Sequence, residues 1–444
     1  MASYTGLTSP TARFSLAIDD SFPTPNRQHK IEASIANKYI TDFSPLNANL
    51  QSGHLNDSYI EYFLPPTSEE FYNFNEIALE LKVRFLKEDG TPVDNTDNIS
   101  FIDGISDRII NRHSVFMNGV QVEGQSYYGL VQSIKKYTSL NNDTLYSRGW
   151  LLGYKSLYSS TQRVYDAAYF GNDGGCEQER DFIAAAKNTC HFMAPLNLDI
   201  ASANTYILNG VGVRIRLELA PPSVVINSSD NSRYRYRIEM SKLWVEKMTP
   251  IPSALISLNK SLTQPAKSIE YLFERPVTKC IIFPSQHRNI NVDNIFNDVI
   301  PEKIYCFMID QTALNGSYTY NAACFPHCSI RSVRLELNGN TIANISCNFP
   351  HEFSQLFYQT LTALNTDNHL FTYSNYKNGR CIMAWDLANS NTHDTVNVER
   401  RGHLRLSIEL AQALATNHAL FIIGITNGVM EISSSRRVST NYLL

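Results

Sequence analysis

The sequence of 444 residues has few cysteines, few charged residues and no long apolar run. Its eight cysteines are too sparse and too irregularly spaced to form a disulfide framework. The longest strongly apolar run, 419–425, is far shorter than the roughly 20 residues needed to span a bilayer. The first twenty residues contain no apolar core of signal-peptide length. We therefore expect a protein that is not secreted by the usual route and whose eight cysteines are all thiols.

Motifs for catalysis and cofactor binding are also missing. There is no Gly-x-Ser-x-Gly elbow and no His-Glu-x-x-His motif. The segment from Gly171 to Gly175 lacks the Lys-Ser/Thr of a phosphate-binding loop, so a flexible loop tip is the favoured interpretation. None of the eleven histidines stands at metal-site or acid–base spacing from a carboxylate, and His113 is interpreted as a structural or surface histidine. The sequence thus predicts no enzyme and no catalytic, cofactor-binding or metal-binding residue.

One short cluster leaves zinc binding open as the weaker alternative. Cys324, His327 and Cys328 are close in sequence, but a closed tetrahedral site needs a fourth ligand, and no second cysteine pair has suitable spacing. Thiols in a reducing compartment are the favoured interpretation.

Nucleic-acid binding has one candidate segment. From Arg233 to Arg237, arginines alternate with tyrosines, and cations interleaved with stacking rings are typical of single-strand binding. Period two, however, would place the arginines on a solvated strand face and the tyrosines on a buried one. Arg436 and Arg437 form a weaker candidate. The net charge of −4 predicts no general basic surface.

The dominant pattern is alternation of apolar and polar residues with period two. It runs through segments 76–87, 213–219, 333–337 and 404–410. Strands of this kind bury one face and expose the other, which is typical of antiparallel sheets. Only two segments of any length, 127–140 and 351–364, show helical spacing.

These patterns recur in the same order in the two halves of the chain. An Asn-Gly hairpin signal at Asn118 returns 220 positions later at Asn338. A Met-Ala pair at Met193 returns 190 positions later at Met383, and the strand 214–220 returns 191 positions later at 405–411. The offset between equivalent motifs falls from 220 at the hairpin to about 190 at the Met-Ala pair, so the first half has about 30 more residues between these motifs. We expect this insertion within 139–179, which is polar and rich in glycine.

The repeat predicts an all-β chain of two antiparallel jelly-roll barrels with short helices in loops. The predicted boundaries are an extended N-terminal arm (1–55), a first jelly roll (56–248), a linker and start of the second half (249–268), a second jelly roll (269–435) and a C-terminal tail (436–444). Prolines interrupt the strand pattern in the linker.

An ordered set of local motifs resembles the double jelly-roll major capsid proteins of Polinton/Maverick elements and adintoviruses, in the class that includes adenovirus hexon. The resemblance spans roughly 58–438. The segments that carry it are 113–119, Tyr127-Tyr128, 208–216, 293–301, Asn315-Gly316, 325–327, Asn338-Gly339, 378–387 and 402–406. In two departures, the helix after the first hairpin is less regular than expected, and the insertion before Phe192 matches no known segment.

The resemblance implies a homotrimer of pseudo-hexagonal outline that tiles an icosahedral shell around double-stranded DNA. Its partners would be neighbouring trimers and penton and minor capsid proteins, with DNA contacted at most non-specifically and no small-molecule substrate. Such a protein would be made in the host cytoplasm or nucleus and located in the virion. Loops 139–179 and 360–376 would form outer towers or clasps, and the arm would serve assembly of trimers into shells.

The alternative is a cellular binding protein of two jelly rolls, either a lectin or a bicupin-like protein. A cupin would need His and Glu ligands on adjacent strands of one barrel, and the spacing of these residues does not indicate such a set.

Overall fold

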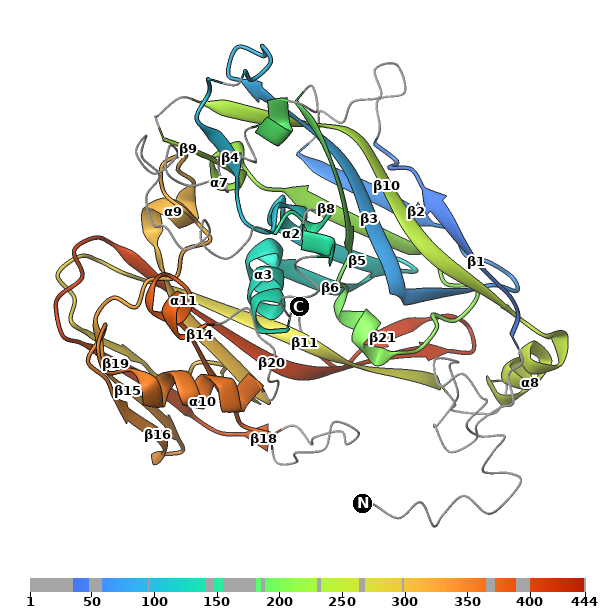
Figure 1. The fold of residues 1–444 in the computed structure, drawn as a ribbon. Coiled ribbons are helices and arrows are strands. Elements are labelled where there is room, and N and C mark those ends of the chain that lie inside the picture. The colour runs from blue at the N-terminus through green and yellow to red at the C-terminus, as the bar shows by residue number, and fades with distance from the viewer. Residues whose placement is uncertain are drawn as a thin grey trace.

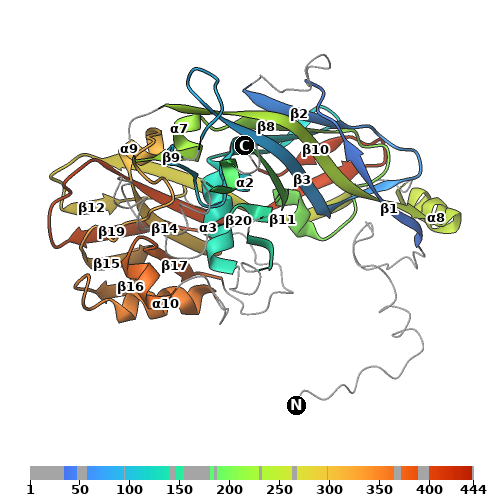
Figure 2. The same ribbon diagram turned by 45° about the horizontal axis from the view of Figure 1, so that its top comes forward.

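A computed structural model shows two β units side by side (Figures 1 and 2). The structure describes residues 35–47, 58–94, 96–139, 147–149, 151–154, 181–184, 188–229, 233–262, 268–297, 299–364, 372–388 and 400–442. Strands dominate these residues, as the period-two pattern predicts.

The first barrel consists of two four-stranded antiparallel sheets. One has the strand order β1 (Ile35–Phe43), β10 (Tyr234–Pro250), β3 (Phe71–Lys87) and β7 (Thr189–Pro195). The other has the order β2 (Tyr59–Leu64), β8 (Val213–Leu219), β5 (Ile110–Met117) and β6 (Val120–Ser126). A short ribbon pairs β4 (Ile99–Phe101) with β9 (Ile226–Ser228).

The second barrel repeats this strand order. Its first sheet is β11 (Ser268–Phe283), β20 (His418–Ser433), β14 (Lys303–Asp310) and β17 (Ile382–Asp386), with β21 (Val438–Thr440) paired to β20. Its second sheet is β12 (Asn289–Val292), β19 (Leu404–Leu410), β15 (Ile330–Leu337) and β16 (Asn340–Ser346). A ribbon pairs β13 (Val299–Ile300) with β18 (Arg400–Arg401).

The repeat extends to the register of individual strands. The β5–β6 hairpin shifts register after Val115, and the β15–β16 hairpin shifts after Leu335, 220 positions later. Both hairpins turn through an Asn-Gly pair at positive φ, 47° and 84° in the first and 52° and 79° in the second. The left-handed conformation at both turn positions explains why Asn-Gly marks these hairpins. The predicted all-β fold of two jelly-roll barrels is confirmed.

Both predicted helices are present, as α3 (Tyr128–Ser139) and α10 (Ser354–Leu364). The expectation that no other segment forms a long helix is wrong, because α8 (Pro252–Leu262) occupies the proline-rich linker. Its proline lies in the first turn, where a missing N–H is tolerated, and so starts the helix instead of breaking it. Shorter helical turns are α2 (Ile105–Arg108), η1 (Asp199–Ala203), α7 (Pro222–Val225), α9 (Gln311–Asn315) and α11 (Tyr373–Lys377).

Part of the predicted arm belongs to a sheet. Strand β1, which the sequence places in the arm, pairs with β10 from Ile35↔Pro250 to Phe43↔Leu243. The side chains described along β1 are exposed or half-buried, so the strand has no buried face and no period-two signal. Main-chain hydrogen bonds to β10 hold it instead. Residues 1–34 of the arm lie outside the described residues.

The buried apolar residues form two clusters. One fills the inside of the second barrel and includes Cys306 and Ile422. The other fills the first barrel and continues onto the opposite face of β14 and β20, through Phe307 and Phe421. The sheet β11-β20-β14-β17 is therefore buried on both faces, by its own barrel and by its neighbour. In the described part of the chain, no helix is both long enough and apolar enough to cross a membrane.

Candidate functional site

The structure does not gather the cysteine–histidine cluster into a metal site. His327 Nδ1 accepts a hydrogen bond from the Ser329 N–H at 2.9 Å, and the His327 ring stacks on Phe349 with centroids 4.7 Å apart. Burial lowers the pKa of His327, which favours the neutral ring in this stack. The seven cysteines that the structure describes are all thiols, and the eighth, Cys176, lies outside the described residues.

The arginine–tyrosine segment has a structural role. The hydroxyl of Tyr236 donates to the Ala220 carbonyl, and Arg237 lies 3.4 Å from Glu239. Arg233 lies 3.4 Å from Glu88. The tyrosines thus anchor the start of β10, and two of the three arginines have carboxylate partners. The glycine-rich segment 171–175 lies outside the described residues.

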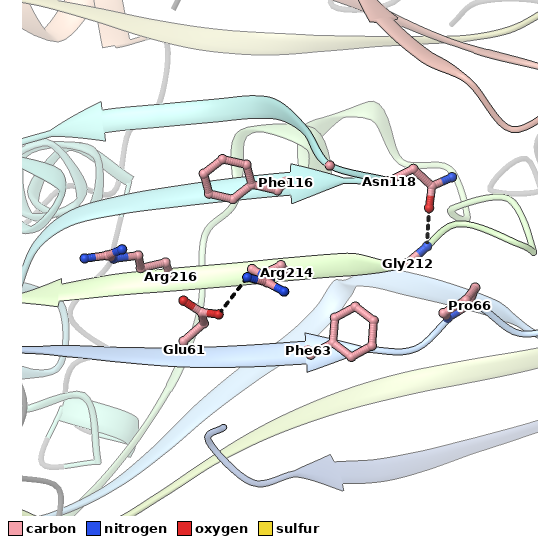
Figure 3. Close-up of a pocket in the computed structure, with 9 residues that line it drawn as sticks. Glu61, Phe63, Pro66, Phe116, Asn118, Gly212, Arg214 and Arg216 are labelled. Carbon is pink, nitrogen blue, oxygen red and sulfur yellow. Dashed lines mark hydrogen bonds and ion pairs between the residues drawn. The ribbon is translucent and has the colours of Figure 1, made fainter. Parts of the chain in front are cut away.

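A hollow of about 540 Å³ lies on the outer face of β2-β8-β5-β6 (Figure 3). Phe63 and Phe116 project from this face, and Pro66 closes one end of it. Its one carboxylate, Glu61, is already ion-paired to Arg214 at 3.3 Å. The hollow therefore offers aromatic and cationic contact surface, and it does not bring a nucleophile together with a base.

The prediction that no histidine pairs with a carboxylate needs correction. His113 is fully buried, and its Nε2 lies 3.0 Å from Glu123 Oε2 on the adjacent strand β6. The carboxylate of Asp199 in η1 completes a buried cluster of three ionisable groups. Sequence spacing missed this set because a hairpin brings β5 and β6 together and a distant turn supplies the third group. One His and one Glu do lie on adjacent strands of one barrel.

Buried charges join the two barrels at a junction that the sequence did not reveal. Arg380, which precedes β17, lies 2.7 Å from Asp103 of the first barrel, and their side chains are only 5% and 4% exposed. Arg380 also donates to the Ala323 carbonyl, and Arg108 donates to the Ala322 carbonyl. Burial lowers the pKa of Arg108. Because the buried Arg380 and Asp103 charges pair with each other across the two barrels, this contact favours one arrangement of the barrels.

Aromatic side chains line the same junction. The Arg380 guanidinium lies over the Tyr137 ring, 4.0 Å from its centroid, and the Tyr137 hydroxyl donates to Asp103 at 2.8 Å. Beside them, Tyr127 packs edge-on against Phe421 of β20 with centroids 5.0 Å apart. Helix α3 and the residue that precedes it thereby present rings to the second barrel.

The C-terminal segment closes the junction from the other end. Arg436 Nε donates to the Asn209 carbonyl at 2.7 Å, and Asn118 Nδ2 donates to the Arg436 carbonyl at 2.8 Å. The Tyr442 hydroxyl donates to the Val122 carbonyl at 2.8 Å. Arg436, a weak nucleic-acid candidate from the sequence, is thus a contact between the two halves of the chain.

One sequence signal could have located this junction. The run 419–425 interrupts the alternation with continuous apolar residues, and a strand buried on both faces has this pattern. The charged contacts left no such signal, because Asp103 and Arg380 are 277 residues apart.

Comparison with known proteins shows the class of fold. No protein-family model matches the sequence, and no curated protein matches it. Solved structures do match over nearly the whole chain. A chain of the Sputnik virophage has a TM-score of 0.60 at 12% identity, covering 92% of this chain and 89% of that one. The protein has the double jelly-roll fold of viral major capsid proteins.

Two major capsid proteins are among the similar structures. The mavirus protein has a TM-score of 0.51 at 11% identity, covering 100% of this chain and 97% of that one. The Faustovirus protein has a TM-score of 0.56 at 9% identity, covering 91% and 92%.

Proposed function

We propose that this chain is a major capsid protein that self-assembles as pseudo-hexagonal homotrimers into an icosahedral shell around double-stranded DNA. The observation that carries the proposal is one chain with two barrels of identical strand order, joined by a buried junction. The likeness to capsid proteins over at least 91% of the chain supports it. The resemblance of the local motifs supports a protein of the Polinton/Maverick or adintovirus type.

The geometry suits a tile. Three chains of two similar barrels would surround a threefold axis with six similar units, which gives a nearly hexagonal outline. A shell subunit must keep its shape while it contacts its neighbours. The buried ion pair between Asp103 and Arg380 resists rotation of one barrel against the other. The function is structural, and DNA would be contacted at most non-specifically.

The oligomeric state tests this function. Because one chain has a mass of 50.2 kDa, light scattering of the purified full-length protein should give about 150 kDa. Negative-stain images should show hexagonal outlines, and added salt should not dissociate the particles, because obligate interfaces are mostly apolar. A monomer with two lobes at micromolar concentration would contradict the proposal and favour the cellular lectin or bicupin-like alternative.

We also propose a role in shell assembly for the N-terminal arm, now restricted to residues 1–34. Deleting residues 2–34 should leave the trimer intact and prevent shells. Deleting residues 2–47 should destabilise the trimer as well, because it removes β1 and uncovers the hydrogen-bonding edge of β10. The two deletions are compared by melting temperature and by particle yield. Normal shells from the shorter deletion would show that residues 2–34 have no role in assembly.

A further inference from the structure

The buried cluster inside the first barrel has the composition of a metal site. His113, Glu123 and Asp199 are 0%, 1% and 6% exposed. One potential ligand atom from each lies within 4.8 Å of the other two. Imidazole and carboxylate together are ligands that first-row divalent metal ions accept, whereas Ca²⁺ and Mg²⁺ prefer oxygen alone.

A fourth side chain points to a ligand independently. Gln125 lies directly opposite His113 in the β5–β6 ladder, so both side chains are on the same face of the sheet. It is 4% exposed, and neither its amide oxygen nor its amide nitrogen has a hydrogen-bond partner among the described residues. His113 Nδ1 and Asp199 Oδ1 are likewise unpartnered there. Buried polar atoms rarely lack a hydrogen-bond partner, and several such atoms in one place indicate a bound polar group.

The carboxylate of Glu123 is already oriented as a ligand would be. Its Oε1 accepts a hydrogen bond from the Ile200 N–H at 2.7 Å, and its Oε2 accepts one from the Asp199 N–H at 3.1 Å. The His113 ring packs edge-on against Tyr128 with centroids 4.8 Å apart. Outer contacts of this kind hold ligands in place in metal sites.

The second barrel shows that the fold itself does not need these polar groups. In the β15–β16 ladder, Val333 pairs with Ile345 in the place of the His113–Gln125 pair, and Ala343 stands where Glu123 stands. The same backbone is therefore built with apolar residues in the second copy. Buried ionisable groups are seldom the most stable choice, so their presence in one copy favours a function.

The charge balance also favours a cation. The Glu123 and Asp199 carboxylates are both buried, and a potential ligand atom of one lies within 4.8 Å of a potential ligand atom of the other. Two carboxylates held this close repel each other when both are ionised, and a bound dication would remove that repulsion.

We propose that the first barrel binds one divalent transition-metal ion, with Zn²⁺ the best fit, between His113, Glu123, Asp199 and the Gln125 amide oxygen. The low exposure of all four makes this a closed, structural site. The ion would tie the β5–β6 hairpin to η1. The Glu274 N–H of β11 donates to Ser202 Oγ of η1 at 2.8 Å, so an ion that holds η1 in place would also stabilise this contact between the barrels. The sequence had predicted no metal ligand.

The test measures Zn²⁺ on full-length protein that has been stripped with chelator. Titration should give one Zn²⁺ per chain and raise the melting temperature, because a ligand that binds only the folded state stabilises it. Asp199→Asn keeps the shape of the side chain and should weaken Zn²⁺ binding at least about tenfold. The matched control is His191→Gln. It breaks the half-exposed His191–Glu80 pair of 2.8 Å in the same barrel, and it should bind Zn²⁺ like the original chain.

A second variant, which carries residues of the second barrel at the equivalent positions, tests the site even if Asp199→Asn does not fold. The triple variant His113→Val, Glu123→Ala, Gln125→Ile should form trimers, bind no Zn²⁺ in the barrel and melt at a temperature that Zn²⁺ does not change. Co²⁺ in place of Zn²⁺ reports the ligand type, and a thiolate charge-transfer band would place the ion on cysteine instead. That band, equal binding by Asp199→Asn, or no response of the original chain to Zn²⁺ would each overturn the proposal.

Discussion

The sheets β1-β10-β3-β7 and β11-β20-β14-β17 occupy equivalent places in the two barrels, but their outer faces have different surroundings. The outer face of β1-β10-β3-β7 carries ion pairs, among them Lys242–Asp42 at 2.8 Å and Lys247–Glu70 at 3.0 Å. The equivalent face of β11-β20-β14-β17 is apolar and packs on the first barrel. All eight residues from His418 to Ile425 are buried. One strand arrangement therefore serves as an outer wall in one copy and as an internal wall in the other.

The interiors of the two barrels differ in polarity. The first encloses His113, Glu123 and Asp199, whereas the described positions equivalent to the first two are Val333 and Ala343. The contrast shows that hydrogen-bond register and strand order define the jelly roll, and that the side chains of each face are set by what that face contacts.

The largest expected effect comes from breaking the junction. Arg380→Ala should lower the free energy of unfolding by about 3–5 kcal/mol, because it removes the guanidinium that pairs with the buried Asp103 carboxylate. The control is Arg331→Ala, which removes a pair with Glu409 whose side chains are 59% and 41% exposed. That loss should stay within about 1 kcal/mol. Denaturant unfolding measures both. Losses of equal size would show that the junction does not hold the barrels together.

A reciprocal exchange sharpens the contrast between the two interiors. Val333→His should lower the free energy of unfolding by about 3 kcal/mol, because a larger polar ring would enter an apolar core. The triple variant His113→Val, Glu123→Ala, Gln125→Ile should change it by no more than about 1 kcal/mol in metal-free protein, since it replaces the polar residues of the hairpin with the apolar residues of the second barrel. Thermal and denaturant unfolding of the two variants give the comparison. A Val333→His variant as stable as the original chain would mean that the second core tolerates polar groups.

The smallest expected effect concerns the charged outer wall and its dependence on pH. Partial burial acts to raise the pKa of Glu239, but hydrogen bonds from Arg84 and Arg237 outweigh it and lower the pKa below the ordinary 4.5. A carboxyl with a lowered folded-state pKa stabilises the fold above pH 4.5, and this contribution disappears as the pH falls through the lowered pKa.

Glu239→Gln should therefore lower stability by at most about 1 kcal/mol near pH 7, and the gap should close below pH 4.5. Denaturant unfolding at pH 7, 5 and 3.5 measures it. Glu431→Gln, at an exposed position of β20, is the control and should change stability by less than about 0.5 kcal/mol. A gap for Glu239→Gln that widens toward acid pH would contradict the assigned ion pairs.

The architecture could be predicted from the sequence because it depends on local patterns of residues. Period-two strands, two helices and the Asn-Gly turns at Asn118 and Asn338 are each readable within a few residues, and their repetition shows the two barrels. Strand β1 was missed because it has no buried face, and α8 because proline was interpreted as a break. The junction and the His113 cluster depend on residues that only the folded chain brings together. Apart from the apolar run 419–425, no signal in the sequence marks these contacts.

The junction also sets an order of events during synthesis. Its contacts join Asp103 to Arg380, Asn118 to Arg436 and Val122 to Tyr442, which are separated by 277, 318 and 320 residues. On the ribosome the first barrel emerges long before these partners. Its apolar face, and the charges of Asp103 and Arg108 that the junction later buries, are still exposed to solvent at that stage. That face becomes covered only when the last residues have been made. A chain that stops before Arg380 would keep it exposed, as a target for chaperones and proteases, and could not form the junction.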